Sequence, residues 1–195
     1  MTVPHLIVIN GLPGSGKTTL FRRLVQGLQI PGFARDGIYE TLFDAMDCAE
    51  SGSPLMLGHG AFSMLYYSAG QLLSMGQPVI MEAFFGRPEL RSAEFRQLQK
   101  RYPFEPIQLL CKADGNVLVD RFLERMTSEG RHLGHQDQAW IEKNRSRLLQ
   151  GKLEPLSIGG TLIEVDTTAS KQKVYDELIV QILSLLNVRK PEGNK

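Results

Sequence analysis

The chain has few cysteines and almost no net charge. Among its 195 residues are two cysteines, Cys48 and Cys111, and its 22 basic side chains nearly balance its 21 acidic ones, which leaves a formal net charge of +1. The cysteines lack the spacing of a metal-binding or redox pair, so we expect two reduced, buried packing residues and a cytoplasmic location. The balanced charge argues against a general nucleic-acid binder.

Long apolar runs are also missing. No stretch approaches the roughly 20 apolar residues of a membrane-spanning helix, and no basic segment opens the N-terminus, so we expect neither a membrane segment nor a targeting signal. A hydrophobic content of 42% over this length suits one globular domain with a full core. We assign residues 1–188 to that domain and expect residues 189–195 to form a disordered polar tail.

Residues 11–18 hold the most specific motif of the chain. Their sequence, GLPGSGKT, fits the pattern G-x-x-x-x-G-K-[ST] without a mismatch. The apolar run 6–9 before it is typical of a buried strand, and apolar residues at helical spacing follow it, namely Leu20, Phe21, Leu24, Val25 and Leu28. A glycine-rich turn could match by accident, but the order of strand, loop and helix favours a Walker A phosphate-binding loop.

This loop predicts the contacts to a nucleotide and a metal ion. Glycines let the backbone approach a phosphate closely, while consecutive N–H groups supply positive potential. Lys17 is expected to reach the β and γ phosphates, and the Thr18 hydroxyl to bind Mg2+. The sequence therefore predicts ATP and Mg2+ as cofactors, with further nucleotide contacts from Gly11, Pro13, Gly14, Ser15, Gly16 and Thr19.

Four more short apolar runs predict strands, at 33–35, 78–81, 107–111 and 161–165. Apolar residues at helical spacing predict helices at 38–47, 55–75, 88–101, 117–126, 138–150 and 174–186. Strands that alternate with helices imply a three-layer α/β/α fold with a five-stranded parallel sheet covered on both faces. The many charges of the 88–101 helix are expected to form a solvated face.

An acidic side chain follows four of the predicted strands, as Asp36, Glu82, Asp114 and Asp166. Because ligands of parallel sheets bind at the carboxyl ends of the strands, we expect these four to surround one crevice with Lys17. Asp36 would address an acceptor group or cap the helix that follows it. Glu82 would support the bound Mg2+, contact an acceptor, or be a buried acid satisfied by a backbone donor.

Several features in this order resemble the small P-loop kinases: the Walker A loop, Asp36 within residues 34–38, the segment 76–82, and Arg121 and Arg125 followed by residues 130–135. This broad group of AAA-type ATP-binding domains includes zeta toxins, chloramphenicol phosphotransferase, gluconate kinase and the kinase part of polynucleotide kinase. The resemblance implies a fold like that of nucleoside monophosphate kinases, with a small helical lid at about 125–137. It also implies transfer of the ATP γ-phosphoryl group to a hydroxyl of an acceptor, which Asp36 contacts or deprotonates.

Roles for residues near the predicted lid follow from this resemblance. Arg125 and Arg131 would stabilise the transferring phosphate, and Arg121, on the same helical face as Arg125, would bind the nucleotide; a solvated basic face is the alternative. By analogy with the fold, Asp166 and Thr167 would lie beside the adenine, although capping of the next helix explains these residues as well.

The sequence also leaves other functions open. Tyr39 stands where relatives that act on nucleic-acid ends tend to have an arginine, so a small-molecule acceptor is expected. Residues 111–114, Cys-Lys-Ala-Asp, resemble the N/T-K-x-D guanine motif of a GTPase switch, but the first position is Cys and no D-x-x-G segment follows a strand. An ATPase or ATP-binding module would keep the Walker A loop without an acceptor. A nucleoside monophosphate kinase would bind the acceptor phosphate through Arg35, Arg87 or Arg91.

Three further groups of side chains have candidate roles. The first group is the pair Phe84 and Phe85, and the second is the helical stripe of Met56, His59, Phe62 and Tyr66. Both groups would line either an acceptor pocket or the core. The third, His132, His135 and Asp137, has spacing that suits a metal, but without further ligands it fits a lid or substrate contact better.

Overall fold

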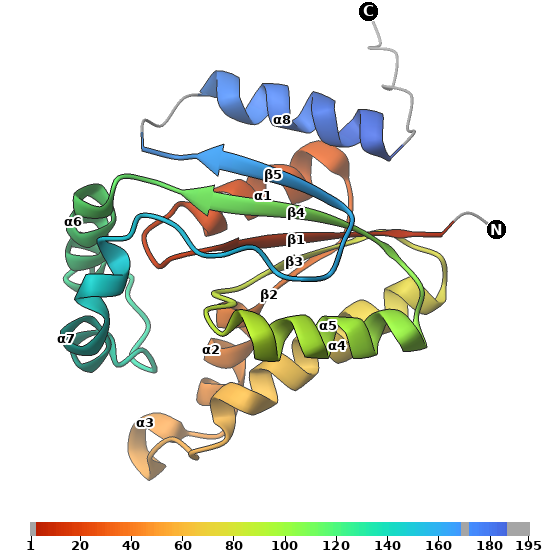
Figure 1. The fold of residues 1–195 in the computed structure, drawn as a ribbon. Helices are drawn as coiled ribbons and strands as arrows, with labels where there is room; N and C mark the ends of the chain where they lie inside the picture. Colours follow the sequence, from red (N-terminus) through yellow and green to blue (C-terminus); the bar gives the residue numbers. More distant parts are fainter. Residues whose placement is uncertain (1–2, 169–171, 187–195) are drawn as a thin grey trace, which may run out of the picture.

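A five-stranded parallel sheet lies at the centre of the molecule (Figure 1). The computed structural model describes residues 3–168 and 172–186. The strands lie in the order β2-β3-β1-β4-β5, and every neighbouring pair is parallel, so all carboxyl ends share one edge. They are β1 (His5–Gly11), β2 (Gly32–Ala34), β3 (Val79–Glu82), β4 (Glu105–Lys112) and β5 (Thr161–Asp166).

Alternating side chains of β1 face opposite layers of helices. Leu6 and Val8 belong to a core with α4 (Leu57–Ser74) and α5 (Pro88–Arg101), whereas Ile7 and Ile9 belong to a core with α1 (Lys17–Leu28) and α8 (Gln172–Leu185). Figure 1 shows α8 above the sheet and α4 and α5 below it. A strand buried on both faces has no polar alternation, which explains its continuous apolar run. The predicted three-layer α/β/α fold is confirmed.

Two helices form a separate cluster at the carboxyl edge of the sheet. α6 (Gly115–Met126) and α7 (Asp137–Leu148) pack together beyond the strand arrowheads of Figure 1, around a core that includes Leu12, Leu118, Phe122, Ile141 and Leu148. On the α4 side, α2 (Arg35–Ala45) packs against α4 and is followed by the short α3 (Cys48–Ser51). The edge where parallel sheets bind ligands is therefore bordered by α2, α6 and α7.

The structure corrects three local predictions. Arg35 does not end β2 but begins α2, so Asp36 lies in the first helical turn and Ala34 is the N-cap residue. The short helix α3 was not predicted. Arg91 is not part of a solvated face: it is 8% exposed, because its guanidinium lies 3.5 Å from the centroid of the Phe62 ring.

Other expectations concern the cysteines and the ends of the chain. Cys48 and Cys111 are both buried and free, as predicted. The tail expected at 189–195 lies outside the described residues. Within the ranges 3–168 and 172–186, no helix has the length and apolar character needed to cross a membrane.

Phe95 of α5 tests the packing of the layer below the sheet. Its side chain is fully buried, and its ring centroid lies 5.2 Å from those of Tyr66 and Phe85. Phe95→Ala should lower the free energy of unfolding by about 3–5 kcal/mol, because it leaves a cavity in a packed core. Leu90→Ala on the same helix, at a side chain that is 42% exposed, should change it by only about 0.5 kcal/mol. Urea denaturation measures both, and equal losses would contradict this packing.

Candidate active site

The loop between β1 and α1 has the backbone of a phosphate cradle. Gly14 and Gly16 adopt left-handed conformations, with φ angles of 83° and 73°. A Cβ atom on Gly14 would lie 2.8 Å from the carbonyl oxygen of Leu118, so no side chain fits there. Gly16 is the N-cap of α1 and supplies no side-chain cap, which leaves the N–H groups of the first helical turn open to an anion.

Lys17 begins α1 and lies over this loop. Its Nζ donates a hydrogen bond to the carbonyl oxygen of Leu12 at 3.0 Å, and the residue is 8% exposed. An ammonium group has three donors, so this single bond leaves capacity for an anionic ligand. The Ser15 Oγ is buried and has no hydrogen-bond partner among the described residues. The loop therefore fits a bound polyphosphate.

A cavity of about 360 Å³ opens beside the loop, and we call it the phosphate-loop cavity. Arg121 borders it from α6, where its Nη2 donates to the carbonyl oxygens of Thr167 and Thr168 at 2.9 and 3.1 Å. The Thr167 Oγ1 in turn donates to the carbonyl oxygen of Ser15 at 3.0 Å. The cavity is lined by Gly14, Gly16, Lys17, Thr18, Thr19, Arg121, Arg125, Thr167 and Tyr175. Of the other predicted nucleotide contacts, Gly11 and Ser15 are buried and Pro13 lines a neighbouring cavity.

The neighbouring cavity has a volume of about 290 Å³, and we call it the carboxylate cavity. Lys17, Thr18 and Arg125 line both cavities and so form their boundary. Ala34 at the end of β2 pairs with Glu82 at the end of β3, which brings Asp36 to the same edge. The rest of the lining is Pro13, Arg35, Asp36, Phe62, Glu82, Phe84, Phe122, Arg131, His135, Asp137 and Trp140.

Two carboxylates of this cavity, Glu82 at the end of β3 and Asp36 in the first turn of α2, have opposite electrostatic environments. Glu82 is 4% exposed, and burial raises its pKa to about 7, with Lys17 opposing the shift and Asp36 adding to it. The Asp36 side chain is 54% exposed, and although desolvation acts to raise its pKa, the charge and the 3.1 Å hydrogen bond of Arg35 make the net shift downward. Asp36 is therefore ionised at neutral pH, whereas Glu82 is near its midpoint.

The expectation that four carboxylates surround one crevice is wrong for Asp114 and Asp166, which line neither cavity. Asp114 caps α6, and its Oδ1 accepts hydrogen bonds from the backbone N–H groups of Asn116 and Val117. Asp166 is exposed and accepts a 2.9 Å hydrogen bond from the backbone N–H of Thr168, which lowers its pKa. Local backbone donors hold both carboxylates outside the site.

Arg125 and Arg131 also differ in what they contact. The guanidinium carbon of Arg125 lies 5.1 Å from the centroid of the Phe122 ring, and its buried Nε has no hydrogen-bond partner in the described part of the chain. Arg131 forms a forked ion pair with Asp137, with Nε to Oδ2 at 2.5 Å and Nη2 to Oδ1 at 2.7 Å. Arg125 is thus available to a ligand, whereas Arg131 holds the start of α7.

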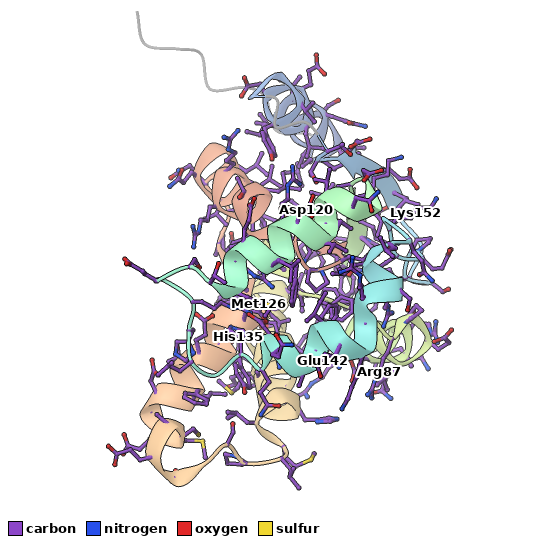
Figure 2. The ribbon with its side chains drawn as sticks, turned by 90° about the vertical axis from the view of Figure 1, so that its left-hand side faces the viewer. Arg87, Asp120, Met126, His135, Glu142 and Lys152 are labelled. Atoms are coloured by element: carbon purple, nitrogen blue, oxygen red, sulfur yellow. The ribbon has the colours of Figure 1, made fainter. Side chains whose placement is uncertain are left out.

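The loop 127–136 between α6 and α7 is attached to α2. His132 Nε2 lies 3.0 Å from Asp44 Oδ1, and His135 Nε2 lies 2.7 Å from Glu40 Oε1. Figure 2 looks onto this side of the molecule and shows His135 where the loop meets α2 and α7. Each histidine therefore has its own carboxylate partner on α2. Among the residues the structure describes, no three His, Cys, Asp or Glu side chains are grouped as a metal site.

The aromatic candidates are divided between the site and other regions. Phe84 lines the carboxylate cavity, where its ring centroid lies 5.8 Å from that of Trp140, whereas Phe85 is 1% exposed and belongs to the core. Phe62 also lines the carboxylate cavity. The other residues of its stripe lie elsewhere: His59 and Tyr66 line a groove between α4 and α5, and Met56 is 64% exposed.

Sequence reasoning missed Asn10. Its Oδ1 accepts hydrogen bonds from the backbone N–H groups of Gly11 at 2.8 Å and of Phe85 at 3.0 Å, and so joins the loop to the segment after β3. The available signal was a polar residue at the end of an apolar strand. Trp140 and Tyr175 were missed as well, because tertiary packing alone brings them to the site.

Comparison with known proteins gives a family and a fold. A family model named AAA_33 and described as an AAA domain matches residues 6–148. A candidate kinase from Chloroflexus aurantiacus J-10-fl is 36% identical, with a TM-score of 0.82 over 94% of this chain and 98% of that one. A search of the curated proteins found no match.

Two more distant solved structures share the fold alone. Kti12 from Chaetomium thermophilum, in complex with ADP-AlF3, is 15% identical with a TM-score of 0.65, over 94% of this chain and 99% of that one. A gluconokinase from Sinorhizobium meliloti 1021 is 16% identical with a TM-score of 0.56, over 95% of this chain and 94% of that one. The fold is thus that of P-loop kinases.

Glu82 should make the stability of the ligand-free protein depend on pH. Its folded-state pKa of about 7 is above the ordinary value of 4.5, so the folded state binds the proton more tightly than the unfolded chain does. The free energy of unfolding should therefore fall by about 3 kcal/mol in total as pH rises from about 4.5 to 7. Above pH 7 it should stay at this lower value. Glu82→Gln should remove most of this loss.

Thermal unfolding in EDTA at pH 5 and pH 8 measures the effect. Glu82→Gln should melt at a higher temperature than the parent protein at pH 8, and the difference should shrink at pH 5. Glu89→Gln, which changes an exposed carboxylate of α5, is the matched control and should follow the parent protein. An unchanged pH dependence in Glu82→Gln would show that this carboxyl is not the buried acid.

Proposed function

The chain belongs to the family of AAA domains that the AAA_33 model describes, and from that premise we propose that it transfers the γ-phosphoryl group of ATP, with Mg2+, to a hydroxyl group of a small molecule. One observation carries this proposal: the phosphate-loop cavity and the carboxylate cavity meet at Lys17, Thr18 and Arg125. An ATPase needs only the first cavity, because its acceptor is water. A second cavity with an ionised carboxylate favours an organic acceptor.

ATP would bind with its phosphates in the loop. The left-handed glycines and the open N-terminus of α1 suit a polyphosphate, and Lys17 would exchange its bond to Leu12 for the β and γ phosphates. Arg121 and Thr167, which border the same cavity, are assigned to the rest of the nucleotide. We do not extend this role to Asp166, because its carboxylate is exposed and lies outside the lining.

Thr18 and Glu82 are the side chains that would hold Mg2+. Both line the carboxylate cavity, and a hydroxyl and a carboxylate are the oxygen ligands that this ion takes together with substrate phosphates. Bound Mg2+ would neutralise phosphate charge and orient the γ-phosphoryl group. A divalent cation beside Glu82 would also favour the ionised carboxylate, which burial alone disfavours.

Asp36 is the group assigned to the acceptor. Its carboxylate is ionised and borders the cavity, so it can accept a hydrogen bond from the acceptor hydroxyl and take its proton. As the acceptor oxygen bonds to the γ phosphorus, the bond from phosphorus to the β–γ bridging oxygen breaks and ADP leaves. Lys17 and Arg125, at the boundary between the cavities, would stabilise the charge that spreads over the transferring group.

The segment 125–137 is proposed as the lid over these cavities. Its loop bonds to α2, and the ion pair of Arg131 with Asp137 fixes the loop to the start of α7. Phe84 and Trp140 form an apolar wall of the carboxylate cavity. A closed, partly apolar cavity would keep water from competing with the acceptor.

Substitution of Lys17 and Asp36 tests this assignment. The protein is incubated with Mg2+ and γ-labelled ATP or GTP against sugars, aminoglycosides, nucleosides and nucleotides, and label in the acceptor is counted. Lys17→Ala should weaken ATP binding and abolish transfer. Asp36→Asn should bind ATP normally but transfer roughly 10²–10⁴-fold more slowly, because it lacks the base. Asp120→Asn, an exposed carboxylate of α6 labelled in Figure 2, is the control and should transfer at the parent rate.

The competing functions predict different results. Release of phosphate only to water, with Asp36→Asn unaffected, would favour an ATPase or ATP-binding module. A preference for GTP would favour a switch protein that reads guanine through residues 111–114. Within that segment, however, Lys112 is paired with Glu164 at 2.6 Å and Asp114 caps α6, so both polar side chains of the motif already have structural partners.

A further inference from the structure

A third cavity lies beside the carboxylate cavity. This outer groove has a volume of about 520 Å³ and is bordered by α7 and by Ser53, Pro54, Leu55, Leu57 and Gly58. It shares Arg35, His135, Asp137 and Trp140 with the carboxylate cavity, so the two cavities adjoin at these side chains. An acceptor whose hydroxyl lies in the carboxylate cavity has room there for a further group.

Arg35 lies at the junction of these two cavities and is held from several sides. Its Nη1 donates to Asp36 Oδ1 at 3.1 Å, and its guanidinium carbon lies 4.6 Å from the ring centroid of Tyr39 and 5.4 Å from that of Phe62. A Cβ atom on Gly58 of α4 would come within 3.0 Å of its Nη2. Residues of α2 and α4 thus fix the position of the guanidinium group.

The donors of this guanidinium are not all used. The Arg35 Nε is buried and makes no hydrogen bond within the described residues. A guanidinium group presents several N–H donors in a planar fork, which matches the two oxygens of a carboxylate or phosphate. A buried donor without a partner is unfavourable, so an acceptor atom from a ligand would stabilise this arrangement.

The other charges of the outer groove leave it favourable to an anion. The carboxylate of Asp137 is neutralised by its forked ion pair with Arg131. His135 is held by Glu40 of α2. Lys143 of α7, exposed to solvent, adds a second positive side chain to the lining. The groove is therefore faced by Lys143 and by the Arg35 guanidinium, which is paired with Asp36 through Nη1 alone, while its own lining acid, Asp137, is paired with Arg131.

The other arginines that could bind an acidic acceptor lie elsewhere. Arg91 is paired with Glu94 at 2.7 Å in the groove between α4 and α5. Arg87 is exposed at the N-cap of α5 and lines none of the three cavities. Of the three arginines that the sequence offers for this role, Arg35 is the one beside Asp36.

We propose that the phosphoryl acceptor carries a carboxylate or phosphate group and that Arg35 binds this group where the carboxylate cavity opens into the outer groove. The inference rests on the proposed kinase function and narrows its substrate to acidic hydroxyl compounds. Lys143 contributes long-range attraction from the rim of the groove. Arg35 then has two roles, because the same guanidinium lowers the pKa of Asp36.

Matched acceptors with and without an acidic group test this specificity. The probes are ribose 5-phosphate with ribose, gluconate with glucitol, and AMP with adenosine, each with ATP and Mg2+. We expect the acidic member of at least one pair to be phosphorylated with a kcat/KM about 10–100-fold above its neutral partner, as expected for a charge-assisted fork. The same compounds are titrated calorimetrically into the protein with ADP and Mg2+ to measure binding without transfer.

Variants of Arg35 separate its two roles. Arg35→Gln should raise KM for the acidic acceptor about 10–100-fold and remove the preference over the neutral partner. If the substitution also alters Asp36, whose pKa Arg35 lowers, that second effect should lower kcat for the acidic and the neutral partner alike. Arg35→Lys keeps the positive charge but not the planar fork of donors. Its KM for the acidic acceptor should lie between those of the parent protein and Arg35→Gln. Arg87→Gln removes an arginine outside the three cavities and should leave all constants unchanged, and thermal melting confirms that each variant is folded.

The outcomes distinguish this inference from the function on which it rests. Equal kcat/KM values for acidic and neutral acceptors would overturn the inference and leave the proposed kinase function intact. An equal loss of kcat/KM for both kinds of acceptor in Arg35→Gln would do the same. Binding of an acidic probe that Arg35→Gln abolishes, without any transfer, would support the anion site and contradict the kinase. If no acidic probe binds or reacts, the inference is wrong.

Discussion

The parallel register of β1, β3 and β2 is the constraint on which the candidate site depends. Ile9 pairs with Glu82, and the backbone N–H of the next residue, Ala83, donates to the Ile9 carbonyl at 3.2 Å. The phosphate loop therefore leaves β1 two residues beyond the level where β3 ends, and β2 brings Asp36 to the same edge. A slip of one residue would turn Glu82 to the opposite face of the sheet, so the register also fixes the chemistry.

This arrangement places charged groups where burial is unfavourable. Glu82 is kept near its midpoint by desolvation, and Lys17 and Arg125 border the same cavity with donors that the protein does not fully use. Such incomplete pairing is unfavourable in a ligand-free core but suits a site whose phosphates and cation supply the missing partners. The side chains at the boundary of the two cavities are accordingly those with most to gain from a nucleotide.

Local patterns predicted most of the fold but only part of the site. The loop 11–18 and the apolar strands are determined by neighbouring residues, so their positions follow from spacing. Asp166 lines neither cavity, and a strand-end position does not reveal that the backbone N–H of Thr168, two residues further on, will hold its carboxylate. Arg91 was assigned to solvent, because its partner Phe62 lies on another helix. The ion pair of Arg131 and the junction role of Arg35 likewise depend on tertiary contacts.

A crystal structure with ADP, Mg2+, aluminium fluoride and an accepted substrate would test the central claim most directly. The measurement is the position of the fluoride group, which imitates the transferring phosphoryl group. The account predicts that it lies at the boundary of the two cavities, in contact with Lys17 and Arg125, with the acceptor hydroxyl and Asp36 on its far side. A fluoride group facing bulk water, with the substrate outside the carboxylate cavity, would contradict the account.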